Sequence, residues 1–485
     1  MKTCILPLDS RPCSYNFVKD LAEIGNYEIV LPPMEIMDNF RTPSSFPVLR
    51  EWLLANAAYC DALIISADQL LYGGLLASRQ SNLTLWEALR RLKIIAQLKD
   101  AHPNLKIYVS TVLMRTTVST LSLESKAWWE AVSQYSRYSY LFAQDEYNAR
   151  LSQIVRDLEE KIPPQVLKEF LSVRERNHAI NMLCVDLAAR GIVEYLLILQ
   201  EDCTEAGIHK VEQERLSKTI EAHDLQHKVA LHNGTDEAIT EMLARAVSQA
   251  PLPAQIKWLG HNNDFIALFE DRPFAHNVKS HMQVVNMYED ETAKRILFIY
   301  HPKETQGDFC TDEINAPVSG YSAEELASFA SEISDAVNQG MEVYLLDVVF
   351  ANGGDYELLS ALSKRISLQQ LNGYSAWNTA SNALGTILSQ MALSKGENNE
   401  KNKRFTLSRV LDDVIYQAVV RRRLNNKLIA NSLDPYHISN MELADEILQA
   451  EWEIAMPLID GIVDGHPFIF GAEYRWPRTF EISLS

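Results

Sequence analysis

Short apolar runs that each stop at polar or charged residues recur along this chain of 485 residues. One run ends at Gln200, and Glu201 and Asp202 follow it directly. Another leads to His232 and then to residues 234–237, GTDE. Apolar runs of this length, when helical spacing follows them, are typical of buried parallel strands that lead into helices. The pattern therefore predicts repeated strand–helix units.

Eleven segments fit this strand pattern, and strand and helix alternate up to about residue 395. The segments are Cys4–Leu8, Tyr27–Leu31, Ala62–Ser66, Lys106–Val112, Tyr195–Leu199, Lys228–Leu231, Ile256–Leu259, Gln283–Met287, Ile296–Tyr300, Val343–Val348 and Ile366–Leu371. Such alternation predicts an α/β fold with mostly parallel sheets and flanking helices. Because eleven strands exceed what one eight-stranded barrel needs, we predict two doubly wound lobes. A TIM-like barrel with extra strands is the alternative.

The same pattern suggests where the lobes begin and end. We predict a first α/β lobe over residues 1–250, with a helical insertion near 121–190, and a second lobe over 251–395. The polar run Ser394–Arg404 is typical of a linker or an exposed loop. Helical spacing after it predicts a helical C-terminal region over residues 405–485.

Charge and composition argue against several classes of partner. The formal net charge is −19 and no stripe of Lys and Arg is visible, so nucleic acid is not expected as a partner. No window approaches the roughly 18 apolar residues that span a bilayer, and the N-terminus lacks the pattern of a signal peptide. The six cysteines are scattered without a CxxC motif. We expect a cytoplasmic protein that does not bind a membrane; its oligomeric state is not predicted.

Polar residues after the first, third and fourth strands are candidates for binding a ligand, because ligands bind at the carboxyl ends of parallel strands. The candidates are Asp9 and Arg11 after the first strand, Asp68, Tyr72 and Arg79 after the third, and Arg115 after the fourth. Pro12 stiffens the first of these loops. For Asp9 and Arg11, an ion pair that braces the end of the sheet is an equal alternative. Gly73 and Gly74 permit an unusual φ or a close approach of a ligand.

The fifth and sixth strand ends carry the candidates for catalysis, which are Glu201, Asp202, Asp236 and Glu237. Hydrolysis of a glycoside uses two carboxyl groups across the scissile bond, one of them kept protonated by its surroundings. We predict that Asp202 is the general acid or base, with Asp236 or Glu237 as its partner. His232 is a candidate for a base or a ligand. A helix N-cap is the alternative for each acid.

A second group of candidate binding residues lies in the second half of the chain. These are Asp347, Asn352, Trp377, Asn378 and Asn382. An aromatic face beside amide donors and acceptors suits a sugar ring, so we predict a small sugar-like ligand. The alternative places Trp377 in the core and makes Thr379 or Ser381 a helix cap.

No fingerprint for NAD, flavin or ATP is present, and we predict no cofactor. Asp9, Asp68, Asp202 and His232 offer a conceivable mixed metal site. Because no HxH or HExxH spacing supports it, no metal is predicted.

Five motifs in this order resemble a bacterial family, domain of unknown function 4127 (DUF4127). They are LPLDSRPC, SADQLLYGGLLASR, QED, GTDE and GYSAWNTASNALG. The family typically shows Asp-Asp where this chain has Glu201-Asp202, which favours Asp202 as the functional acid. The resemblance implies no activity, and a few residues are similar to glycosidases only by analogy.

The function that we expect from these residues is that of a carbohydrate-active enzyme, a glycoside hydrolase acting on a small glycoside. The alternatives are a metal-dependent hydrolase or lyase on a polar small molecule, and a non-catalytic sugar- or metabolite-binding protein.

Overall fold

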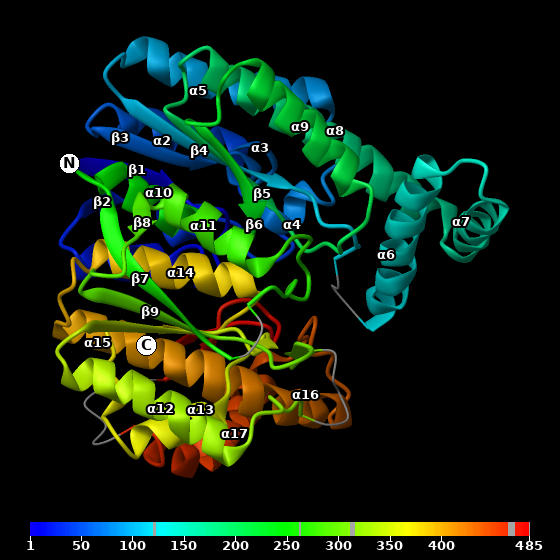
Figure 1. The fold of residues 1–485 in the computed structure, drawn as a ribbon. Helices are drawn as coiled ribbons and strands as arrows, with labels where there is room; N and C mark the ends of the chain where they lie inside the picture. Colours follow the sequence, from blue (N-terminus) through cyan, green and yellow to red (C-terminus); the bar gives the residue numbers. More distant parts are fainter. Residues whose placement is uncertain (120–122, 261–262, 311–315, 464–470, 485) are drawn as a thin grey trace. The chain divides into compact units, whose positions relative to one another are not determined.

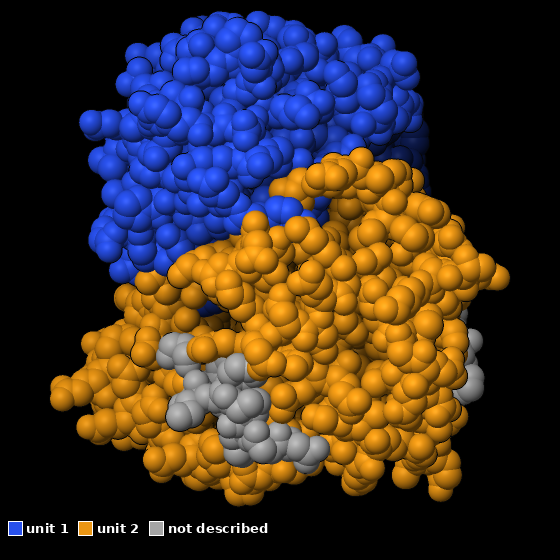
Figure 2. All heavy atoms as spheres, turned by 90° about the vertical axis from the view of Figure 1, so that its left-hand side faces the viewer, with its two compact units in different colours: residues 1–15, 27–246, 269–271 blue, residues 16–26, 247–268, 272–485 orange. Residues whose placement is uncertain are grey.

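The structure is a computed structural model that describes residues 1–119, 123–260, 263–310, 316–463 and 471–484 (Figure 1). The chain divides into two compact units, which Figure 2 shows in different colours. Unit 1 comprises residues 1–15, 27–246 and 269–271, and unit 2 comprises residues 16–26, 247–268 and 272–485. The lobe boundaries that we predicted at residues 250 and 395 stay predictions.

The sheet of unit 1 has six parallel strands in the order β2-β1-β3-β4-β5-β6. The strands are β1 (Lys2–Leu6), β2 (Glu28–Val30), β3 (Ala62–Ser66), β4 (Lys106–Leu113), β5 (Tyr195–Gln200) and β6 (Val229–Asn233). Strand order reverses its direction between β1 and β3. Ligands bind doubly wound sheets outside the carboxyl ends of the strands at such switch points.

The helices of unit 1 are α2 (Phe46–Ala57), α3 (Ala67–Tyr72), α4 (Leu75–Ser78), α5 (Leu85–Ala101), α6 (Leu123–Gln144), α7 (Ala149–Lys161), α8 (Pro164–Ala189), α9 (His209–Ala222) and α10 (Ala238–Val247). A short 3₁₀ turn spans Met34–Ile36. Helices α5, α8 and α9 lie along one face of the sheet (Figure 1). Alternate strand residues such as Ile107 and Val109 are buried in the same core as Leu98 of α5, as strand periodicity requires.

The sheet of unit 2 has five parallel strands in the order β13-β11-β9-β7-β8. The strands are β7 (Leu252–Leu259), β8 (Met287–Glu289), β9 (Arg295–Tyr300), β11 (Glu342–Asp347) and β13 (Gly373–Ser375). Numbered within their own unit, the first five strands of both sheets have the order 2-1-3-4-5. Over the described strands neither sheet closes into a barrel. The prediction of two doubly wound lobes is therefore confirmed, and the barrel alternative is not formed.

The helices of unit 2 are α1 (Asn16–Ile24), α11 (Phe274–Val284), α12 (Ala323–Asn338), α13 (Tyr356–Ser363), α14 (Ala380–Leu393), α15 (Glu400–Arg409), α16 (Arg421–Ala430) and α17 (Met441–Asp460). A π-helical segment, Val410–Val420, joins α15 to α16. Helices α11 and α14 lie on one side of the sheet and α12 and α13 on the other (Figure 1). The predicted helical C-terminal region is present as α15, α16 and α17.

Two small sheets complete unit 2. The strands β10 (Gly307–Asp308) and β12 (Phe350–Ala351) pair in parallel. The strands β14 (Ala472–Tyr474) and β15 (Ile482–Leu484) form an antiparallel pair near the C-terminus.

Two of the eleven predicted strands are wrong, as is part of the predicted linker. Helix α11 continues to Val284, so a strand in this region begins only at Met287. A 3₁₀ turn, Leu368–Gln370, replaces the strand expected over residues 366–371, because Ser367 and Gln370 form a capping box. The second half of the predicted linker is the start of α15, which the Asn399 side chain caps.

Two further observations concern helices and thiols. Within the described ranges, no helix has both the length and the apolar composition that crossing a bilayer would require. None of the six cysteines, all of which lie within the described ranges, forms a disulfide.

Candidate functional site

Glu201 and Asp202 follow β5 and contact two arginines from neighbouring strand ends. Arg79 forms an ion pair with Glu201, and the Arg115 guanidinium forms one with Asp202. The Arg115 backbone N–H also donates to Oε2 of Glu201 at 3.0 Å. The Glu201 side chain is 3% exposed and that of Asp202 is 28% exposed. The four predicted residues therefore form one group, in which Asp202 is the acid that solvent reaches.

Asp68 lies in the first turn of α3, directly after β3. Its Oδ2 accepts a hydrogen bond from the Val112 backbone N–H at 2.9 Å. Burial raises the pKa of Asp68 to about 7; the Val112 hydrogen bond opposes this shift, and the Glu201 carboxylate adds to it. This shift favours the protonated form of Asp68 near neutral pH, and the ion-paired Glu201 carboxylate contributes to it.

The double glycine after α3 has the unusual conformation that was expected. Gly73 and Gly74 have φ of +87° and +129°. A Cβ on Gly73 would lie 2.7 Å from the Ser44 backbone nitrogen, so glycine is required here by close packing. The Tyr72 ring lies under the Arg176 guanidinium, with 4.4 Å from its carbon to the ring centroid.

Arg11 connects two acids from distant strands of the sheet. Its Nε donates to Asp9 at 2.8 Å, and its two terminal nitrogens donate to the two oxygens of Asp236 at 2.6 and 3.2 Å. Asp9 and Asp236 follow β1 and β6, which three other strands separate. The ion-pair alternative for Asp9 and Arg11 is thus what the structure shows, and it fastens loops at the same end of the sheet to each other.

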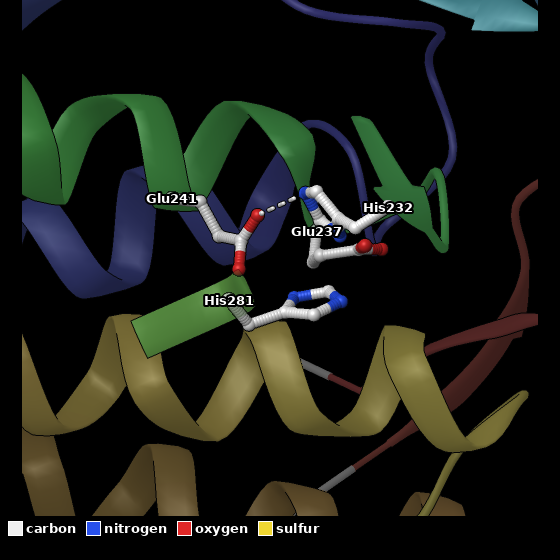
Figure 3. A group of neighbouring side chains, drawn as sticks. All are labelled: His232, Glu237, Glu241 and His281. Atoms are coloured by element: carbon white, nitrogen blue, oxygen red, sulfur yellow. Dashed lines mark ion pairs between the residues drawn. The ribbon is translucent and has the colours of Figure 1, made fainter. Parts of the chain in front are cut away.

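His232, Glu237 and Glu241 form a third group in unit 1 (Figure 3). Nε2 of His232 lies 3.5 Å from Oε2 of Glu241. All three side chains are fully or almost fully buried. Burial and then the charge of Glu241 raise the pKa of Glu237 well above its usual range. Burial likewise raises the pKa of Glu241 to about 8, although His232 opposes this shift.

Cys203, His209 and Asp271 form a fourth group in the same unit, also with burial of every member. Nε2 of His209 lies 3.3 Å from Oδ2 of Asp271. The same oxygen already accepts hydrogen bonds from Lys210 at 2.6 Å and from Gln213 at 2.9 Å. The Asp271 carboxylate is thus neutralised by a lysine, which makes this group a poor cation site.

The predicted sugar-binding residues of the second half all belong to unit 2. Asn382 donates to Oδ1 of Asn378 at 2.6 Å, and the Asn352 backbone N–H donates to the Asn378 carbonyl at 2.6 Å. The Trp377 ring packs against Phe480 at 5.5 Å between centroids and is 5% exposed. The structure brings Asn352, Asn378 and Asn382 together, with the neighbouring Trp377 largely buried.

Asp347 is held among hydrogen-bond donors within unit 2. It accepts from the backbone N–H groups of Asp355 and Val349 and from the Tyr374 hydroxyl, at 2.6, 3.3 and 3.0 Å. Burial and then the charge of Asp355 raise the pKa of Asp347 to about 7. These bonds fix the loop after β11, so Asp347 is placed as a structural acid.

A family model described as protein of unknown function (DUF4127) matches residues 3–485. The chain belongs to this family. No curated protein and no solved structure matches it. The DUF4127 match covers the strand ends of both units, so the motifs that suggested the family lie in one continuous match.

Several grouped residues of this DUF4127 chain were not predicted from sequence. They are Glu241, His209 and Asp271. Glu241 lies inside a helix rather than at a strand end, yet its i,i+4 spacing from Glu237 places both acids on one helical face. That spacing was a usable signal. Asp271 and His209 are 62 positions apart, and no local pattern connects them.

Proposed function

We propose that unit 1 is a hydrolase that acts on a small glycoside at the carboxyl ends of β3, β4 and β5. One observation carries the proposal: Asp68 is buried with a raised pKa, and the charge of Glu201, which pairs with Arg79, contributes to that shift. Two carboxyl groups whose surroundings favour opposite protonation states are what glycoside hydrolysis requires.

In the proposed reaction, Asp68 donates its proton to the oxygen of the leaving group. Glu201 or Asp202 provides the carboxylate that stabilises or attacks the sugar carbon, and water completes the hydrolysis. Asp202 is the more exposed of the two, so we assign it the first contact with the substrate. Arg115 holds both acids and thereby positions them.

Asp236 and Glu237 were predicted as partners of Asp202, and the proposal gives them other roles. Both oxygens of Asp236 accept hydrogen bonds from Arg11, which supports a role in holding the loops. Glu237 belongs to the group with His232 and Glu241. Asp68 therefore replaces them as the proposed proton donor.

We also propose that the protein works in the cytoplasm on a polar small molecule and not on nucleic acid. The net charge of −19 and the lack of a disulfide among the six described cysteines support this.

A turnover screen by mass spectrometry tests the proposal. The purified full chain is incubated with aryl glycosides, oligosaccharides and peptidoglycan fragments, with and without divalent metal. We expect release of a sugar by wild type, and loss of turnover in Asp68→Asn and Asp202→Asn. Asp347→Asn is the matched control, because it changes a buried acid of unit 2. Binding of a sugar without turnover would favour the non-catalytic alternative, and equal turnover in all variants would refute the assignment of Asp68.

A further inference from the structure

One histidine from strand β6 and two glutamates at the start of helix α10 lie close together. His232 is the fourth residue of β6, and Glu237 directly precedes α10. The Glu241 backbone N–H donates to the Glu237 carbonyl at 3.0 Å, which confirms that one helical turn separates the two acids. One potential ligand atom of each residue lies within 4.8 Å of those of the other two. Figure 3 also labels His281, which belongs to helix α11 of unit 2.

The Glu237 carboxylate is the clearest sign of a ligand. Its residue is 1% exposed, and among the described residues neither of its oxygens has a hydrogen-bond partner. A buried carboxyl group without a partner costs several kcal/mol to ionise, so a buried carboxylate that is ionised is paired or coordinates a metal. Gly234 leaves the space that this carboxylate occupies, because a Cβ there would lie 2.0 Å from Oε1 of Glu237.

His232 is oriented as a metal-ligating histidine is. Its Nδ1 lies 2.9 Å from the Asn233 carbonyl oxygen. A carbonyl only accepts, so Nδ1 carries the hydrogen and the lone pair of the neutral ring is on Nε2. Nε2 is the atom that faces Glu241, at 3.5 Å. Two ligand atoms of a tetrahedral zinc ion with bonds of about 2.1 Å are separated by roughly 3.4 Å, which this distance matches.

We propose that His232, Glu237 and Glu241 bind one divalent transition-metal ion, Zn²⁺ or Mn²⁺. Two carboxylates balance the charge of such an ion, and one imidazole with carboxylate oxygens suits these metals. The site is separate from Asp68 and Glu201, and the inference does not depend on the proposed hydrolase activity.

Metal binding by the full chain tests the inference. After treatment with EDTA and desalting, Zn²⁺ or Mn²⁺ is titrated by calorimetry, and bound metal is counted by mass spectrometry. We expect about one ion per chain. Because loss of even an outer-shell partner of a ligand costs about 10–100-fold in affinity, Glu237→Gln and His232→Ala should weaken binding by at least about 100-fold.

Two matched variants locate the site. Glu212→Gln changes a buried glutamate that pairs with Arg174, and it should keep wild-type affinity. Cys203→Ser changes the other group of potential ligands, and it should also keep wild-type affinity. Loss of binding in Cys203→Ser with full binding in Glu237→Gln would overturn the proposal, and so would wild-type protein that binds no metal.

Two readouts guard against variants that fail to fold. Glutamine is neutral, so metal-free Glu237→Gln should melt at or above the temperature of the metal-free wild type, and only the rise on adding metal should disappear. Wild-type protein loaded with Co²⁺ should show the spectrum of nitrogen and oxygen ligands. A sulfur-to-cobalt charge-transfer band would show that a cysteine binds the ion and would refute the site.

Discussion

Asp347 in unit 2 and Glu237 in unit 1 are both buried acids near the carboxyl end of a parallel sheet of the same strand order. Asp347 accepts three hydrogen bonds from its surroundings. Glu237 accepts none from the described residues. Asp413 of unit 2 resembles Asp347, since it accepts from the backbone N–H groups of Ala376 and Trp377.

The difference teaches how to separate structural acids from functional ones on a common topology. A buried acid surrounded by donors already uses its lone pairs to fix loops, so its removal should lower stability. A buried acid that lacks donors, or that keeps a proton beside an ion-paired carboxylate, is instead a candidate for a functional site. The predictions below test this division.

The largest effect is expected on turnover. Asp68→Asn should lower kcat for a confirmed glycoside by about 10²–10⁴-fold, the usual contribution of a general acid. At pH 5, where Asp68 holds its proton, the melting temperature should change little, because asparagine is neutral and similar in size. Asp347→Asn should show the reverse, with lost stability and nearly normal kcat. Steady-state kinetics with thermal melts on both variants checks this, and a similar loss of kcat in both would break the comparison.

The next largest effect is on stability. Asp413→Ala should destabilise unit 2 by about 3–5 kcal/mol, because it leaves the buried Arg409 without one of its carboxylate partners. Hydrogen exchange read by mass spectrometry should show faster exchange in α15 and around residues 376–377. Glu446→Ala, which changes an exposed acid on α17, is the control and should alter neither stability nor hydrogen exchange. Unchanged exchange in Asp413→Ala would contradict a structural role.

Acid pH should stabilise both units. Burial raises the pKa values of Asp68, Asp347 and Asp413 from 3.8 to about 7. Between about pH 4 and 7 the folded chain therefore binds protons that the unfolded chain has released, and stability falls as pH rises through this window. A shift of one pKa unit corresponds to about 1.4 kcal/mol, so each group lowers the free energy of unfolding by up to about 4 kcal/mol as pH rises across this window.

Melting temperatures across the pH range check this expectation. The melting temperature should be higher at pH 5 than at pH 8, and Asp347→Asn should flatten the profile. A melting temperature that rises from pH 5 to pH 8 would contradict the assignment of raised pKa values.

The smallest expected effect is on the stability of unit 2, and it concerns the amide side chain of Asn382. Asn382→Ala removes one hydrogen bond to Asn378 and should cost about 1 kcal/mol. If these amides bind a sugar, its affinity should fall more than tenfold, far beyond the loss of stability. Titration calorimetry with a sugar identified in the turnover screen separates the two roles, and equal affinity in variant and wild type would leave Asn382 structural.

Sequence patterns were sufficient for the parts of the fold that depend on local periodicity. Strand β3 was predicted with its observed limits, because an apolar run between polar residues defines it. Strand β13 was missed, since it has only three residues and begins with glycine. The prediction that residues after neighbouring strands lie together was possible because parallel strands end at the same edge of a sheet. The ion pair between Arg11 and Asp236 could not be predicted in this way, because it depends on how far two loops reach across the sheet.

Helix α1 belongs to unit 2, whereas the strands before and after it in the chain belong to unit 1. Its partner there is α15, where the Phe17 and Phe405 rings lie 5.4 Å apart. Ribosomes add about 5–20 residues per second, so α1 waits roughly 20–80 s during synthesis before α15 exists. Throughout that interval Phe17, Val18 and Leu21, all buried in the folded chain, lack this packing partner. The nascent protein thus presents an apolar helix that a chaperone can hold until α15, in the last fifth of the chain, has been made.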